Sequence, residues 1–452
     1  MDEKELRTLL AQAAAETTAP GIAASVAKNG VPTAAATGLA RLRPPQPTTP
    51  GTSYGIASIT KTLTAIAVMQ LVEQGRLSLD DPAEKYLPIE LRVRGKPVTI
   101  EHLLSHTSGI PAPGYAEAQI AAITGSKSSW APFGTAADVL AFLEKAARDW
   151  AVSEPGERYF YLNEGYIALG VVVERVSGQK YEEYIERHIA APLGMRSTSI
   201  GSPREPSAAP YTYTPGQGFQ EAPQPPYVWS DGGGYSTALD LQRLTLTLLN
   251  RGRLGGEEIL QPSSVEEMEK PRARLPWQPL GGGEDAYGLG LIINNLPGLG
   301  KLIGHSGALP GYSSYMGYSR DQGSTVTLLA NTMMPARDYA AAILAAATGR
   351  DPWSLPAHRA ARTASLLEGE YRGYQGLIAA RLRRIGDALL LESVAPRGFL
   401  EAVLMPHDLS DPQRPVYAVH ARGRLLLVEF RIGSDGAIEM IYERYRLVKR
   451  GA

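Results

Sequence analysis

A change of pattern between residues 351 and 363 most constrains how this chain can fold. Before it, some segments carry apolar residues at helical spacing and others at strand-like spacing; after it, every periodic segment predicts a strand. With 452 residues the chain is also longer than one ordinary domain. We therefore predict a mixed domain over residues 1–360 and an all-strand domain over residues 361–452.

The second domain contains six predicted strands with tight turn signals between them. They span residues 369–374, 377–385, 388–393, 416–421, 425–432 and 438–448. In the second strand, Ala380 and Leu382 alternate with Arg381 and Arg383, so one face is core and the other faces water. This pattern predicts a small antiparallel β-barrel or sandwich.

The first domain has strands toward both ends and helices between them. Helical spacing dominates residues 75–230, which we expect to form a helical subdomain. Residues 202–226 are rich in Pro, Tyr and Gly and predict a long irregular loop. The glycine run 281–283 lacks the lysine and threonine of a phosphate-binding loop, so we interpret it as a linker.

Composition excludes several classes of function. A net charge of -1 gives no electrostatic reason to expect nucleic acid or an anionic membrane as a partner. The absence of cysteine excludes disulfides, thiolate metal sites and cysteine nucleophiles. The first residues are acidic and lack the apolar region of an export signal, and no window has the roughly 20 apolar residues of a membrane span. We therefore expect a cytoplasmic protein.

Ser58 and Lys61 form the first candidate for chemistry. They lie three residues apart at the start of an apolar-periodic segment, and a helix brings such residues onto one face. The serine would then have a base beside it and free backbone N–H groups of the first helical turn nearby, as an acyl-transfer nucleophile requires. Taken alone, the pattern also fits a capping serine followed by a solvated lysine.

Two later triplets favour the catalytic interpretation. A Tyr-x-Asn triplet begins at Tyr161 and a His-x-Gly triplet begins at His305. This order of motifs resembles that of the penicillin-recognising serine hydrolases, the superfamily of serine β-lactamases and penicillin-binding proteins. Residues 102–110 and 233–241 are similar to stretches of its class C β-lactamase-like branch, which includes D-amino-acid peptidases and esterases. The resemblance covers about residues 15–348.

The resemblance implies a fold as well as a reaction. Residues 1–360 would form an α/β (α+β) β-lactamase-like or transpeptidase fold with an inserted helical domain. Residues 361–452 resemble the lipocalin-like barrel of some peptidases in this family, where it contributes to assembly and limits access. A homo-oligomer formed through the barrel is therefore a further expectation. The implied chemistry needs no cofactor and no metal.

The family pattern also implies roles for four side chains. Ser58 would attack a carbonyl carbon and form an acyl-enzyme. Lys61, with its pKa lowered by desolvation, would take the serine proton. Tyr161 would share this work and deliver the proton to the leaving group. Asn163 would hydrogen-bond Lys61 and a substrate amide.

The His-x-Gly triplet would complete the substrate site. Backbone N–H groups of Ser58 and Ala308 would form the oxyanion hole, and Gly307 would let the substrate backbone approach. His305 replaces the lysine of β-lactamases and most penicillin-binding proteins. A free imidazole has a pKa of about 6.5 and is mostly neutral, so a substrate carboxylate is less favoured here.

We therefore predict a peptidase or amidase that acts on short peptides, including those with D-amino acids. A histidine at this position resembles the esterase and peptidase branches, so a carboxylesterase or a weak β-lactamase is the alternative within the fold. A non-catalytic module that binds penicillin or peptides is the alternative of another class.

Three further patterns have competing interpretations. Residues around Ser306 approximate a Gly-x-Ser-x-Gly nucleophile elbow, but that elbow leads into a helix and residues from Tyr312 onward predict a strand. His102 and His106 have metal-ligand spacing without a third ligand, which favours core or capping roles. Glu164 follows the tyrosine motif, and we interpret it as a structural acid at a helix start.

Overall fold

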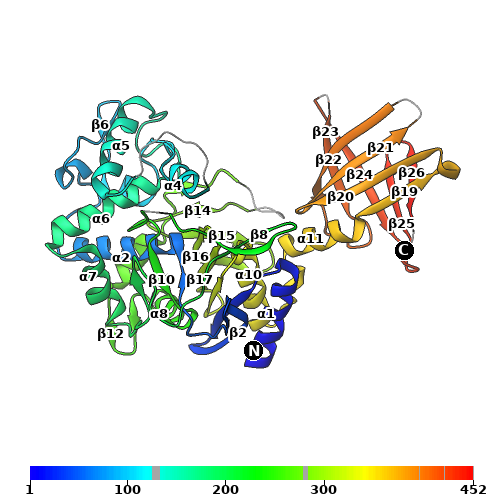
Figure 1. Ribbon diagram of the computed structural model, residues 1–452. Coiled ribbons are helices and arrows are strands. Elements are labelled where there is room, and N and C mark those ends of the chain that lie inside the picture. Colours follow the sequence, from blue (N-terminus) through cyan, green and yellow to red (C-terminus); the bar gives the residue numbers. More distant parts are fainter. Residues whose placement is uncertain (125–132, 226, 278–282, 396–397, 422, 451–452) are drawn as a thin grey trace. The chain divides into compact units, whose positions relative to one another are not determined.

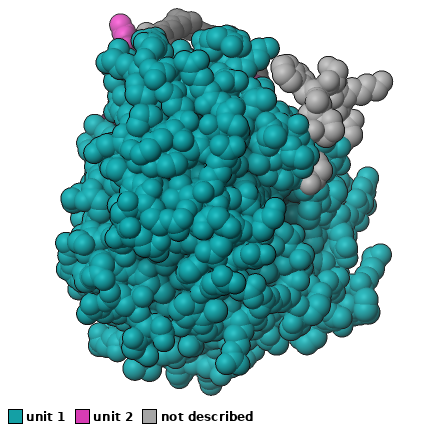
Figure 2. All heavy atoms as spheres, turned by 90° about the vertical axis from the view of Figure 1, so that its left-hand side faces the viewer, with its two compact units in different colours: residues 1–352 teal, residues 353–452 magenta. Residues whose placement is uncertain are grey.

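The computed structural model describes residues 1–124, 133–225, 227–277, 283–395, 398–421 and 423–450. The chain forms two compact units, residues 1–352 and residues 353–452, coloured teal and magenta in Figure 2. The sequence-based boundary at residue 360 falls inside helix α11 (Pro356–Leu367). Of the glycine run predicted as a linker, only Gly283 lies within the described residues.

Unit 1 is built on a nine-stranded antiparallel sheet (Figure 1). Its order is β13-β14-β15-β16-β17-β18-β1-β2-β3, so strands from the two ends of unit 1 pair at β18 and β1. The strands are β1 (Gly21–Lys28), β2 (Val31–Leu42), β3 (Pro45–Pro47), β13 (Ala273–Arg274), β14 (Ala286–Tyr287), β15 (Ile292–Leu296), β16 (Gly300–Leu309), β17 (Tyr312–Ser319) and β18 (Ser324–Ala330).

Helices cover the central strands of this sheet. Helices α8 (Ala238–Leu249) and α10 (Ala336–Ala347) both contact β1, β17 and β18, and α1 (Glu3–Thr17) contacts β1, β2 and α10. Because helices shield the central strands, β17 and β18 are buried along their whole length and show no polar alternation. The sheet is therefore a rigid frame for residues at its strand ends.

The region between β4 (Tyr54–Gly55) and β10 (Gly234–Ser236) is mainly helical. It contains α3 (Ile100–Leu104), α4 (Tyr115–Thr124), α5 (Ala136–Asp149), α6 (Asn163–Ser177) and α7 (Tyr181–Ile185), with a π-helical turn over Glu186–Ala190. Residues 202–226 are not wholly irregular as predicted, because Tyr211–Thr214 (β8) and Gly218–Glu221 (β9) pair as a hairpin.

Short elements complete unit 1. They are the 3-10 turns Ala57–Ile59 (η1) and Ala83–Lys85 (η2), helix α9 (Pro262–Met268), and strands β5 (Arg92–Val93), β6 (Lys96–Pro97), β7 (Ser199–Ile200), β11 (Arg253–Leu254) and β12 (Glu257–Glu258). A further 3-10 turn, η4 (Pro352–Ser354), includes the last residue of unit 1 and the first two of unit 2. Among the described residues, no helix is both long enough and apolar enough to cross a membrane.

Helix α2 (Thr60–Glu73) runs through the core of unit 1. Every residue from Thr60 to Leu71 is buried, so this helix has no solvent-facing side over that length. It contacts α6 and α7 of the helical region, and its own start follows η1, which contacts β16 and β17. The α2 N-terminus therefore lies where the sheet meets the helical region.

Unit 2 is a closed antiparallel barrel of eight strands, preceded by α11. The strands are β19 (Gly369–Gly373), β20 (Ile378–Ile385), β21 (Ala388–Ala395), β22 (Gly398–Asp408), β23 (Val416–Ala421), β24 (Arg424–Ile432), β25 (Ile438–Tyr442) and β26 (Tyr445–Lys449), with a short turn, η5 (Tyr374–Gly376), after β19. The aromatic rings of Tyr371, Tyr417 and Phe430 fill its core, and Ala364 and Leu367 of α11 join that core.

The antiparallel barrel is confirmed, but the prediction of six strands was wrong. It missed β22 altogether. It also treated residues 438–448 as one strand, whereas Glu443 has a φ of 51° and turns the chain between β25 and β26. The region of changed composition before the barrel is helical, because α11 spans Pro356–Leu367.

Candidate active site

Ser58 lies in a sharp turn at the point where β4 leads into α2. Ala57, the residue before it, has a φ of 48°, a left-handed conformation that is uncommon for a residue with a side chain. From Thr52 to Leu71, Ser58 is the one residue that is not buried. The local backbone therefore presents this hydroxyl at the surface of an otherwise buried segment.

The Lys61 ammonium group is next to the serine. Its Nζ lies 3.1 Å from Ser58 Oγ, 2.8 Å from Asn163 Oδ1 and 2.5 Å from the carbonyl oxygen of Asp231. Burial lowers the pKa of Lys61 to about 8, although the negative charges of Asp231 and Glu164 act in the opposite direction. A fraction of Lys61 is thus neutral near pH 8 and able to accept a proton.

Tyr161 lies in the loop directly before α6. Its ring centroid is 4.9 Å from Lys61 Nζ. Burial raises the pKa of its hydroxyl, and a hydrogen bond with Ser58 opposes that shift. Tyr161 therefore touches both the serine and the lysine, and it carries its proton at neutral pH.

His106 holds the backbone beside Tyr161. The Leu162 N–H donates to His106 Nδ1 at 3.0 Å, so the imidazole proton is on Nε2. Its ring centroid is 4.3 Å from that of Tyr161 and 4.7 Å from that of Tyr287. Burial, with the charge of Lys61 adding to it, lowers the pKa of His106 well below its usual value. A neutral imidazole therefore packs behind the tyrosine.

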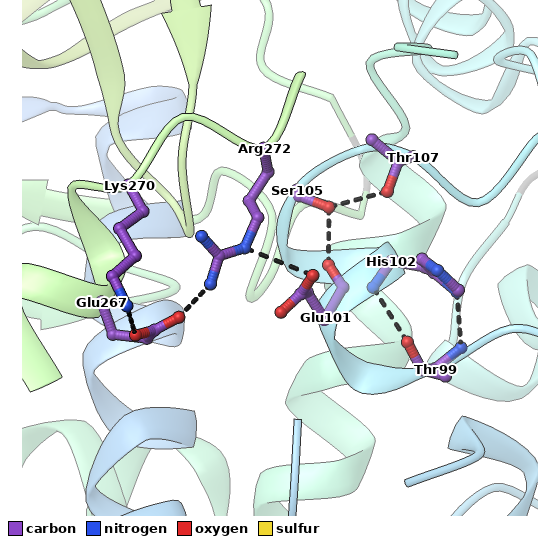
Figure 3. Close-up of polar contacts among 8 residues, drawn as sticks. All are labelled: Thr99, Glu101, His102, Ser105, Thr107, Glu267, Lys270 and Arg272. Carbon is purple, nitrogen blue, oxygen red and sulfur yellow. Dashed lines mark hydrogen bonds and ion pairs between the residues drawn. The ribbon is translucent and has the colours of Figure 1, made fainter. Parts of the chain in front are cut away.

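The segment that carries His106 is tied down by polar contacts (Figure 3). Thr99 and His102 form a reciprocal cap at the start of α3, with the Thr99 N–H donating to His102 Nδ1 at 3.1 Å. Glu101 pairs with Arg272 at 3.2 Å, and Arg272 also pairs with Glu267. His102 thus has a capping role, and among the described residues no cluster of three or more His, Cys, Asp or Glu is arranged to hold a metal ion.

His305 is a neutral acceptor rather than a cation. Its Nδ1 lies 2.6 Å from the Ser306 carbonyl oxygen, which can only accept, so Nδ1 carries the proton. The Tyr287 hydroxyl then donates to Nε2 at 2.9 Å. Burial lowers the pKa of His305 to about 3, and the positive charge of Lys61 adds to this effect.

Gly307 brings β16 against the turn that carries the serine. A Cβ at this position would lie 2.1 Å from the Ile56 carbonyl oxygen and 2.4 Å from Ser314 Oγ. Ala308 follows it and is exposed. Ser306 is also on β16, and β17 follows as a strand from Tyr312. The nucleophile elbow is therefore excluded, since it would need a helix there.

A cavity of about 630 Å³ opens over this site. Its lining includes Ser58, Tyr159, Tyr161, Asn163, Trp277, Asn294, His305, Gly307, Ala308, Arg337 and Asp338. A second cavity of about 100 Å³ shares Ser58, Asn163 and Ala308 with it and is also lined by Tyr115, Gln119 and Tyr227. The structure thus brings all seven predicted site residues together: six line the larger cavity, and the buried Lys61 contacts Ser58.

Arg337 and Asp338 are lining residues that the sequence did not reveal. Arg337 Nε and Nη2 both lie 2.9 Å from Asp338 Oδ1. The cavity therefore does contain a cation, but its charge is offset by the adjacent carboxylate. Neither residue belongs to a recognisable motif, and the acidic residue in the first turn of α10 is an ordinary helix-start feature.

Glu164 is the second residue of α6, and its side chain is buried. Its carboxylate accepts a hydrogen bond from the Tyr115 N–H at 3.1 Å. Burial raises the pKa of Glu164 to about 7, although its hydrogen bonds with backbone N–H groups oppose that shift. Near pH 8 this carboxylate is ionised and contributes a negative charge to the surroundings of Lys61.

Comparison with known proteins identifies families for both units. Residues 6–350 match the family described as Beta-lactamase, and residues 352–448 match the Pab87 octamerisation domain. The chain is 26% identical over 435 residues to Penicillin-binding protein 4* of Bacillus subtilis (strain 168). The aligned region covers 89% of this chain and 88% of that relative.

Two solved structures are similar to the chain as well. The octameric penicillin-binding protein homologue from Pyrococcus abyssi has a TM-score of 0.90 and 38% identity, over 99% of this chain and 100% of that chain. A D-stereospecific amidohydrolase from Streptomyces sp. has a TM-score of 0.60 and 27% identity, over 74% of this chain and 95% of that chain. The predicted fold class is confirmed, and the chain belongs to the Beta-lactamase family within the superfamily of serine β-lactamases and penicillin-binding proteins.

Proposed function

We propose that this protein is a serine hydrolase that forms an acyl-enzyme on Ser58 and cleaves amide bonds in short peptides, including peptides with D-amino acids. The observation that carries the proposal is the 3.1 Å contact between Lys61 Nζ and Ser58 Oγ, with the Tyr161 ring centroid 4.9 Å from the same Nζ. A nucleophile, a base with a lowered pKa and a second proton carrier thus meet at one cavity.

Acylation follows from this arrangement. The neutral Lys61 amine takes the proton of Ser58 as Oγ attacks the carbonyl carbon. Backbone N–H groups of Ser58 and Ala308 stabilise the negative oxygen of the tetrahedral intermediate. The C–N bond then breaks, and the leaving nitrogen receives a proton through Tyr161. A water molecule hydrolyses the acyl-enzyme and regenerates the serine hydroxyl.

Two features of the cavity disfavour a carboxylate-bearing β-lactam as the natural substrate. His305 is neutral where a lysine would attract a carboxylate, and Arg337 is already paired with Asp338. The similarity to a D-stereospecific amidohydrolase supports amide chemistry and substrates with D-residues. A carboxylesterase or weak β-lactamase remains the alternative within the same fold.

A substrate panel with matched variants tests the proposal. Peptide p-nitroanilides of both chiralities are compared with p-nitrophenyl esters for the wild type, Ser58→Ala and, as a control, the exposed Ser202→Ala. We expect amide turnover, higher for D-residues, that is lost in Ser58→Ala and kept in the control. Full turnover by Ser58→Ala contradicts the assignment of the nucleophile, and turnover of esters alone favours the esterase.

Covalent labelling separates an enzyme from a binding module. A fluorescent phosphonate reacts with an activated serine hydroxyl and not with a merely accessible one. We expect labelling of the wild type and none of Ser58→Ala. A wild-type protein that binds peptides yet forms no adduct at any pH is a non-catalytic binding module.

We further propose that the chain forms a homo-oligomer through unit 2. The support is the match of residues 352–448 to the Pab87 octamerisation domain and the similarity over the whole chain to an octameric homologue. Sedimentation velocity of the full-length chain tests this directly, and a single monomeric species at all concentrations contradicts it.

A further inference from the structure

The barrel of unit 2 has few ways to associate with another copy. Its eight strands form a closed barrel, so pairing of a strand edge with another chain is disfavoured. The inner face is filled by its own core. Loops and the outward-facing side chains of the strands are therefore the main surfaces for self-association.

Several outward-facing charged residues of the barrel form ion pairs between or within strands. Arg383 on β20 pairs with Glu392 on β21 at 3.0 Å. Arg431 pairs with Glu429 on β24, also at 3.0 Å, and Arg446 on β26 pairs with Glu439 on β25. These strands thus present the polar outer face expected of a barrel in water.

Part of the outer face of β22, β23 and β24, away from the Arg431–Glu429 pair, is different. Val403 and Met405 on β22 are 48% and 50% exposed, and Leu425 and Leu427 on β24 are 48% and 49% exposed. Ala418 on β23 lies between the two pairs, since it is the register partner of both Met405 and Leu427. We call these five residues the outer apolar patch.

The outer apolar patch is contiguous around Ala418, and the exposed His420, the register partner of Leu425, faces outward at its edge. Its three strands are neighbours in the barrel (Figure 1). Ala418 faces outward between the inward-facing Tyr417 and Val419, yet it is only 5% exposed because the longer side chains on both sides cover it. A contiguous apolar cluster of this kind on a water-facing surface marks an interaction site.

We propose that the outer apolar patch of one copy packs against the same patch of a second copy. The inference rests on the homo-oligomer proposed above, and it assigns the contact to particular strands. A self-complementary contact needs one surface only, as in a two-fold symmetric interface. The patch has no charged member, so two copies meet without burying like charges against each other.

Sedimentation velocity on full-length variants tests the assignment. Met405→Glu with Leu427→Glu places charges in the patch, and Ile385→Glu with Val448→Glu is the matched control, since those residues are 52% and 40% exposed elsewhere on the barrel. We expect a smaller species for the patch variant at concentrations where the wild type and the control are assembled. Circular dichroism and melting temperature establish that each variant is folded.

The outcomes distinguish the two proposals. A monomeric wild type ends the homo-oligomer proposal and this inference with it. An assembled wild type together with an assembled, folded patch variant overturns this inference alone.

Cross-linking gives an independent answer if the charged variant does not fold. The wild type has no cysteine, so Leu427→Cys or Met405→Cys introduces the only thiol in the chain. We expect a short bis-maleimide to join two copies through either thiol and not through Val448→Cys. Absence of the covalent dimer from both patch variants overturns the inference.

Discussion

Asn163 and Lys61 connect helices α6 and α2 at the candidate site. Asn163 is the first residue of α6, and its Oδ1 accepts a hydrogen bond from Lys61 Nζ of α2 at 2.8 Å. The same amine contacts Ser58 at 3.1 Å. A change at Asn163 therefore acts on the proton affinity of the base without touching the nucleophile.

The first prediction is that Asn163→Asp raises the pKa of Lys61. A carboxylate at hydrogen-bond distance favours the ammonium form, by about one unit or more. Lys61 is a base only when unprotonated, so kcat/KM should rise with pH through its pKa, near pH 8 in the wild type. We expect this rise to move to higher pH in Asn163→Asp. Asn163→Ala adds no charge and should lower kcat without that upward shift, and equal profiles for the two variants contradict the prediction.

Glu164→Gln should have the opposite effect. Its negative charge raises the pKa of Lys61, so its removal should move the rise of kcat/KM to lower pH. Glutamine keeps an oxygen that can accept the Tyr115 N–H. Glu174→Gln is the matched control, because Glu174 is on the same helix and also accepts a backbone N–H, that of Tyr181. A shift to higher pH in Glu164→Gln, or an equal shift in the control, contradicts the prediction.

Local spacing in the sequence was enough to predict that the proposed nucleophile and its base lie next to each other. Ser58 and Lys61 are three residues apart, and the turn into α2 places them in contact as helical geometry requires. The positions of Tyr161 and His305 came from the order of motifs and not from any contact visible in the sequence. Their meeting at one cavity depends on the pairing of distant strands and the docking of α6 on α2.

The family motifs predicted the distant contact between Asn163 and Lys61, but contacts made by backbone atoms outside those motifs could not be predicted. The Asp231 carbonyl oxygen binds Lys61 from 170 positions away, and a backbone carbonyl has no sequence signature. Strand β22 was missed for a different reason. Val403 and Met405 face outward although they are apolar, so the alternation that predicts a half-buried strand is lost, and Pro406 weakens the strand pattern further.

A third prediction concerns the charge of the larger cavity. Asp338→Asn leaves Arg337 without its carboxylate partner, so its guanidinium is free to bind a carboxylate on a ligand. We expect acylation by penicillins and by substrates with a free carboxylate to improve about tenfold, the scale of one hydrogen bond to a charged group. Neutral esters should be unaffected, and the double variant Arg337→Gln with Asp338→Asn should lose the gain. An equal gain for neutral esters contradicts the prediction.

The last prediction is that Gly307→Ala separates β16 from the turn that carries Ser58. The new Cβ would meet the Ile56 carbonyl oxygen at 2.1 Å and Ser314 Oγ at 2.4 Å, and the Ile56 oxygen belongs to the backbone and cannot rotate away as a side chain can. Overpacking of this kind costs about 1–3 kcal/mol, so the melting temperature should fall. Because Ala308 follows on the same strand, the proposed oxyanion hole should widen as well, and kcat should fall more than binding of substrate weakens.

Gly51→Ala is the control, since the nearest atom to its Cβ is 3.9 Å away. Calorimetry and kcat are measured for both variants, and a Gly307→Ala protein with the melting temperature and kcat of the wild type shows that the close approach of β16 to Ile56 is not needed at this site.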